Sequence, residues 1–105
     1  MTEQPSTLYA KLLGETAAIS WLELQPFFAR GALLLVDGRQ DLIAVAEALA
    51  QNEQHKVAAW LAEGVLTKAQ DTHAEDLLTR NPALWAVVVA PWVLAQERHE
   101  PSLAH

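Results

Sequence analysis

Apolar residues recur three or four positions apart in five segments of the chain, and this spacing predicts amphipathic helices. A polar residue of the kind that caps helices precedes four of the segments. Ser20 has Glu23 three positions later, which is the signature of a capping box. The predicted helices are 7–19, 21–30 after Ser20, 42–50 after Asp41, 53–63 after Asn52 and 72–80 after Asp71.

Three short apolar runs predict β-strands because they are too short for helices and are bordered by turn residues. They are Leu33–Val36, Val65–Ala69 and Trp85–Val89. The predicted order is α-α-β-α-α-β-α-β. We therefore expect a single small α+β domain in which helices cover a sheet of about three strands.

Pro91 interrupts the last apolar run. Proline has no N–H for a strand ladder, so an edge, a bulge or a break is expected there. An edge strand can recruit another chain, and tryptophan is a common interface anchor. Trp85 and Trp92 are an odd number of residues apart, so one of them should be exposed or line a groove unless a bulge brings them to one side. The predicted interface residues are Trp85, Pro91 and Trp92.

Composition adds limits to this description. The chain has 105 residues, of which 51% are hydrophobic, and 13 acidic against 7 basic residues give a net charge of −6. This acidity argues against a nucleic-acid partner. The longest apolar run, 83–95, is shorter than the roughly 20 residues that span a bilayer. We expect a cytoplasmic protein with no membrane contact, a loose N-terminus at 1–6, one domain at 7–97 and a disordered tail at 98–105.

Metal and cofactor chemistry find little support in the sequence. Asp71, His73 and Asp76 could in principle converge on a zinc ion. A helix cap at Asp71 and the helix dipole, which favours acidic residues in the first turn, explain these residues better. The chain has no cysteine, so thiolate ligands are absent. We expect no metal and no cofactor.

The loop after the first predicted strand is the candidate ligand site. Asp37, Arg39 and Asp41 follow that strand, and ligands often bind beyond the carboxyl ends of strands in sheets flanked by helices. Arg39 could hold an anion together with the amides of the next helix. An ordinary Asp-Gly turn with a local ion pair explains the same residues.

The sequence contains no G-x-S-x-G elbow, no phosphate loop and no paired carboxylates. We therefore predict no catalytic residues and favour a non-enzymatic interaction or regulatory module that binds another protein or itself. The alternative, which includes an enzyme, is a small-molecule or anion-binding protein with its site at Asp37–Asp41.

Nearly the whole chain resembles a bacterial family of short uncharacterised proteins, the domain of unknown function numbered 2288. The resemblance is carried by the segments LYAKLLGETAAISWLELQPFFARGALLLVD, DLIAVAEALAQN, VAAWLAEG and LWAVVVAPWVLAQE. The last segment is the most specific. The resemblance implies a free-standing cytoplasmic protein and carries no activity or functional residue.

Overall fold

The computed structural model describes residues 7–98. Residues 1–6 and nearly all of the tail expected at 98–105 lie outside this range, so those two expectations are not addressed by it. Within the described residues the helices are α1 (Thr7–Glu15), α2 (Trp21–Ala29), α3 (Leu42–Ala50), α4 (Gln54–Glu63) and α5 (Asp71–Arg80). The strands are β1 (Ala17–Ile19), β2 (Leu33–Val36), β3 (Leu66–Lys68), β4 (Leu84–Val89) and β5 (Trp92–Glu97).

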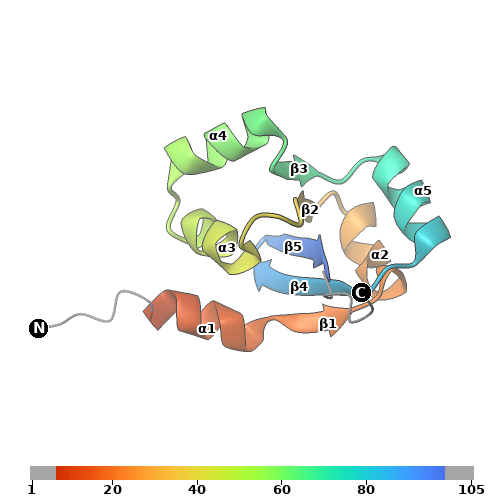
Figure 1. Cartoon of the computed structure of the whole chain (residues 1–105), viewed down its shortest axis with the longest axis horizontal. Coiled ribbons are helices and arrows are strands. Elements are labelled where there is room, and N and C mark those ends of the chain that lie inside the picture. The colour runs from red at the N-terminus through yellow and green to blue at the C-terminus, as the bar shows by residue number, and fades with distance from the viewer. Residues whose placement is uncertain (1–6, 99–105) are drawn as a thin grey trace, which may run out of the picture.

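The strands form one mixed sheet in the order β1-β4-β5-β2-β3 (Figure 1). Neighbouring strands are antiparallel except for β2 and β5, which are parallel. The hairpin of β4 and β5 therefore lies inside the sheet. Three-residue strands close both edges, and short edge strands limit pairing with other chains.

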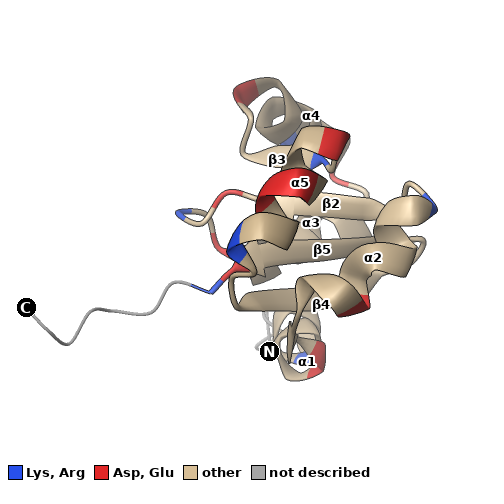
Figure 2. Ribbon diagram, turned by 90° about the vertical axis from the view of Figure 1, so that its right-hand side faces the viewer, with Lys and Arg blue, Asp and Glu red and all other residues tan. Residues whose placement is uncertain are grey.

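Helices cover both faces of the sheet, and the alternation of side chains along each strand supplies both cores. On one face, Val87 and Leu94 pack with residues of α1 and α3, and α4 adds partly buried side chains. On the other face, Ala86 and Val93 pack with residues of α2 and α5. Figure 2 views the molecule with α2 and α5 toward the reader. The expected α+β class with a helix-covered sheet is confirmed.

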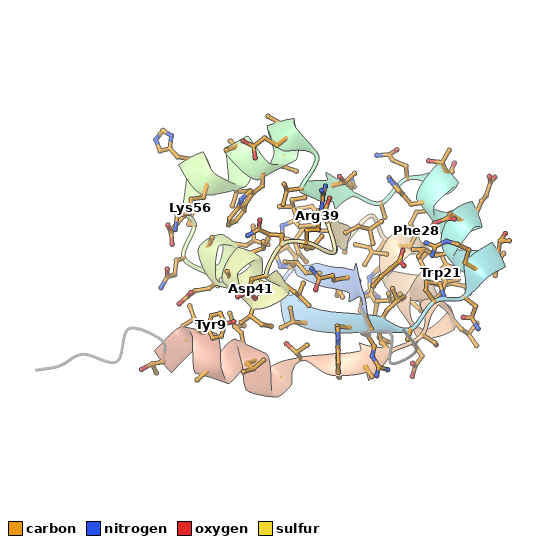
Figure 3. The ribbon with its side chains drawn as sticks, viewed as in Figure 1. Tyr9, Trp21, Phe28, Arg39, Asp41 and Lys56 are labelled. Atoms are coloured by element: carbon orange, nitrogen blue, oxygen red, sulfur yellow. The ribbon has the colours of Figure 1, made fainter. Side chains whose placement is uncertain are left out.

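The second predicted helix has the expected start. The Glu23 N–H donates to Ser20 Oγ at 3.3 Å, and the Ser20 N–H donates to Glu23 Oε1 at 3.0 Å. This capping box orients α2 so that Trp21 and Leu24 are buried. The Trp21 and Phe28 rings lie 5.6 Å apart between their centroids (Figure 3).

Two details of strand number and order were predicted wrongly. The segment 7–19 is a helix only to Glu15, after which Ala17–Ile19 forms β1 beside β4. The run around Pro91 forms two strands and not one, because Pro91 lies in the tight turn of a hairpin. Its Ala90–Pro91 peptide bond is cis. Of the edge, bulge or break expected at Pro91, the structure has the break, because the turn divides the run; the edge is not found, since β4 and β5 are both interior strands.

Two predicted helix caps are displaced by one residue. Glu53, and not Asn52, is the N-cap of α4, and Asn52 has a positive φ of 58°. Gln70, and not Asp71, precedes α5. The end of α4 is as expected, because Gly64 takes the left-handed conformation that favours glycine, with φ 79°.

None of the helices within residues 7–98 combines the length and the hydropathy required to cross a lipid bilayer.

Candidate functional site

The loop after β2 is held in place by its own side chains. The Asp37 carboxylate accepts the Arg39 N–H at 2.9 Å and lies 3.4 Å from Arg39 Nε. These hydrogen bonds, the backbone one first, hold the pKa of Asp37 below its ordinary value. The Arg39 side chain is 92% exposed, so it points into solvent and not into an enclosed pocket.

Asp41 caps α3 and also bonds to a residue of α1. Its Oδ1 accepts the N–H groups of Ile43 at 2.9 Å and Ala44 at 3.3 Å, which starts α3 as predicted. Its Oδ2 accepts the Tyr9 hydroxyl at 2.7 Å, and Figure 3 shows the two side chains meeting between α1 and α3. The amides expected to hold an anion are therefore already bonded to Asp41.

The Tyr9 phenol stays protonated in this arrangement. Its hydrogen bond to Asp41, followed by burial and the charges of Asp41 and Glu47, raises the pKa of Tyr9 above its ordinary value. A phenol of this kind donates a hydrogen bond and is a poor nucleophile. The pair therefore suits binding better than acid-base chemistry.

Gln96 on β5 fixes the loop to the sheet. Its Nε2 donates to the carbonyl oxygens of Asp37 at 2.9 Å and Gln40 at 2.6 Å. Gln96 was not among the predicted site residues, because a single glutamine in a strand matches no motif. Its role can be recognised only from its position opposite Trp85, and that position follows from the register of the hairpin.

A groove opens between α1, α3 and the β4–β5 hairpin, and we call it the Trp85 groove. Its volume is about 450 Å³, within the range of ligand-binding clefts. Leu42 and Ile43 contribute buried side chains, whereas Trp85 is 37% and Leu13 55% exposed. The lining residues are Tyr9, Leu13, Thr16, Asp41, Leu42, Ile43, Trp85 and Gln96.

Trp85 also contacts Arg98, which directly follows β5. The Arg98 guanidinium carbon lies 4.7 Å from the centroid of the Trp85 ring, which is the geometry of a cation–π contact. The Arg98 N–H donates to the Ala83 carbonyl oxygen at 2.9 Å. Arg98, the first residue of the predicted tail, thus packs on the domain.

The predicted interface residues are separated by the hairpin. Trp85 pairs with Gln96 and Trp92 pairs with Val89, so both tryptophans face the same side of the sheet at opposite ends of the β4–β5 hairpin. Pro91 is exposed in the turn, and Trp92 is half-buried against the core shared with α1 and α3. The structure brings Trp85, and not Trp92, to the groove.

The residues weighed as metal ligands serve structural roles on α5. His73 Nδ1 accepts the Gln70 N–H at 2.9 Å. Asp76 accepts two hydrogen bonds from Arg80, at 2.8 and 2.7 Å, and the same guanidinium donates to Glu97 at 2.6 Å. Across residues 7–98, no group of three His, Cys, Asp or Glu residues is placed to hold a metal ion.

Catalytic groups do not gather in the Trp85 groove either. Its lining contains no histidine, cysteine or lysine, and the Thr16 hydroxyl donates to the Leu12 carbonyl oxygen at 2.8 Å. A nucleophile needs a base within hydrogen-bonding reach, and the Thr16 hydroxyl has instead a backbone carbonyl. The groove offers apolar contact, a carboxylate and an amide.

The fold and the groove define a small α+β domain with a five-stranded mixed sheet between two helical layers, over the residues described. The chain belongs to the family described as protein of unknown function (DUF2288), whose model matches residues 7–97. This match confirms the resemblance found in the sequence.

A solved structure supports the same fold. The chain is similar to the protein in the NMR solution structure of PA1075 from Pseudomonas aeruginosa, with 67% sequence identity and a TM-score of 0.80. The similarity covers 100% of this chain and 97% of that chain. Comparison with curated proteins gives no match.

Proposed function

We propose that this domain is a non-enzymatic protein-interaction module whose partner docks in the Trp85 groove. One observation carries the proposal: Trp85 and Leu13, two large apolar side chains, are both exposed within the same groove. Tryptophan is prominent among the residues that dominate binding energy at interfaces. An exposed apolar cluster with a polar rim is the kind of surface that marks interaction sites.

The surroundings of the groove suit a preformed binding site. Asp41 joins α1 to α3 through Tyr9 and caps α3, and Gln96 holds the neighbouring loop. These bonds tie together the elements that form the walls of the groove. A wall held in this way loses little conformational entropy when a partner binds.

Small-molecule binding is the second candidate function. The parallel strands β2 and β5 end at the same edge, where Val36, Asp37, Gly38, Glu97 and Arg98 line a hollow of about 380 Å³. Ligands bind at this position in many sheets flanked by helices. In this candidate Arg39 and Asp41 flank the ligand. Against it, Asp37 and Glu97 already bind Arg39 and Arg80.

Affinity capture from the cells that produce the protein tests the leading proposal. The baits are wild type, Trp85→Ala, Leu13→Glu, Arg39→Ala and Leu22→Ala. Leu22 is the matched control, because it is 73% exposed on α2, outside the groove. Circular dichroism checks that each bait is folded.

We expect a protein retained by wild type, Arg39→Ala and Leu22→Ala to fall about 30-fold with Trp85→Ala, as for the loss of an interface hot spot. Leu13→Glu should give a similar loss. The proposal is wrong if both groove variants retain the same proteins as wild type, or if wild type retains none. A loss confined to Arg39→Ala would favour the second candidate.

A further inference from the structure

We infer that the Trp85 groove binds a segment of another protein that presents an arginine or lysine next to a bulky aliphatic residue. This inference rests on the proposed function and adds the chemistry of the partner. Four features of the described residues support it: the charge of the groove, its floor, the Trp85 ring and the form of the sheet edges.

The charge at the groove is negative. Asp41 is the single charged residue among the lining residues, and the Glu47 carboxylate on α3 acts on the same Tyr9 phenol. A carboxylate offers about four acceptor positions. Asp41 uses three of them, for Ile43, Ala44 and Tyr9, so Oδ2 keeps one for an incoming cation.

The floor of the groove is apolar. Leu42 and Ile43 at the start of α3 are each 5% exposed, and Leu13 completes the surface from α1. An aliphatic side chain placed here would be removed from water together with Leu13, and such burial is favourable in proportion to its apolar area. The carboxylate lies next to this floor on α3, so a cation and an aliphatic residue must be close in the partner.

The Trp85 ring already accepts a guanidinium. Arg98 stacks on it at 4.7 Å, and Arg98 lines the neighbouring hollow with Asp37 and Glu97 and not the groove itself. The Arg98 guanidinium therefore contacts the ring from outside the groove. A tryptophan ring attracts cations through its π-electrons, and Arg98 already makes this contact, so the partner's basic residue is expected at the Asp41 carboxylate and not on the ring.

A second copy of this chain fits the groove poorly. Each copy has 13 acidic against 7 basic residues, so a second copy would bring charge of the same sign to Asp41. Addition of a strand at the sheet edge is disfavoured too, since β1 and β3 have three residues each. A basic segment seated in the groove avoids both difficulties.

Peptide display on the full chain, followed by fluorescence anisotropy with the selected peptides, tests the inference. The variants are Asp41→Asn, Trp85→Ala and Leu13→Glu, with Leu22→Ala as control. Asparagine caps helices about as well as aspartate, so Asp41→Asn removes the charge and keeps the start of α3. Circular dichroism again reports folding.

The expected result is enrichment of peptides with Arg or Lys beside Leu, Ile or Phe. Their Kd should rise about fivefold with Asp41→Asn, the upper range for an exposed ion pair, and about 30-fold with Trp85→Ala. If Trp85→Ala fails to fold, the same loss is expected from Leu13→Glu. Leu22→Ala should bind like wild type.

Four results would overturn the inference. Enriched peptides that are acidic or neutral but lose binding with Trp85→Ala would refute the basic partner and leave the proposed function standing. Peptides that bind equally to every variant, or no enrichment at all, would contradict both. A dimer that Trp85→Ala or Leu13→Glu dissociates would make a second copy the occupant.

Discussion

At the scale of single residues, α2 contains two leucines in opposite environments. Leu24 is fully buried in the core between the sheet, α2 and α5, whereas Leu22 is 73% exposed. Only two positions separate them on the same helix, so helix propensity affects both in the same way. Their substitution therefore compares burial alone.

We expect Leu24→Ala to lower the free energy of unfolding by about 2–5 kcal/mol, because it removes transfer energy and leaves a cavity. Leu22→Ala should change it by less than about 0.5 kcal/mol. Urea unfolding followed by circular dichroism measures both. Similar midpoints for the two variants would contradict the assignment of the buried face of α2.

The residues of the candidate site differ in how far the sequence predicts them. Asp41 was predictable as a cap, because its position before an apolar periodic run is a local signal. Its bond to Tyr9 was not, since the two residues are 32 positions apart and meet only once α1 packs against α3. Gln96 and Arg98 were missed for the same reason.

At the scale of elements, the five helices and the strands β2, β3 and β4 were predicted, whereas β1 and β5 were missed. β1 has three residues, AAI, which carry no alternation, and it exists because β4 offers it a ladder. Pro91 predicted an edge, a bulge or a break; it lies in a hairpin turn, which is such a break, and a proline there removes no donor from the ladder. The sheet therefore has two more strands than predicted.

The junction of α5 and β5 provides a pH test. Arg80 joins Asp76 on α5 to Glu97 on β5, and its hydrogen bonds to Asp76 hold the pKa of that carboxyl below its ordinary value. A carboxyl group whose pKa is lower in the folded state stabilises the fold at pH values above its unfolded pKa of about 3.9. That stability is lost as the pH falls through the lower pKa of the folded state.

We therefore expect Arg80→Met to be less stable than wild type near pH 6, with a difference that shrinks as the pH falls below about 4. Thermal unfolding from pH 6 to pH 2 measures this. Because the groups are exposed, the difference should also shrink at about 1 M salt. Lys11→Met removes the same charge from α1 and is the control. A difference that stays constant with pH would rule out the ion pairs as its source.

At the scale of the whole molecule, the two helical layers leave one tryptophan more exposed than the others. Trp21 is buried, and Trp60 and Trp92 are half-buried against the core. Trp85 is the large aromatic residue of the described chain that remains substantially exposed. The sheet is buried where helices cover it. Beside Trp85, at one end of the hairpin, α1 and α3 leave a groove open. We therefore place the proposed function of the domain at the Trp85 groove.

The most direct test of this claim is a chemical-shift map. The uniformly ¹⁵N-labelled full chain is titrated with a display-selected basic peptide, and the backbone amides and tryptophan indole N–H signals are followed. We predict that the shifted signals cluster at Leu13, Thr16, Asp41–Ile43, Gln96 and the Trp85 indole, and that α4 and α5 stay unchanged. Shifts centred on another surface, with the Trp85 indole unmoved, would contradict the account.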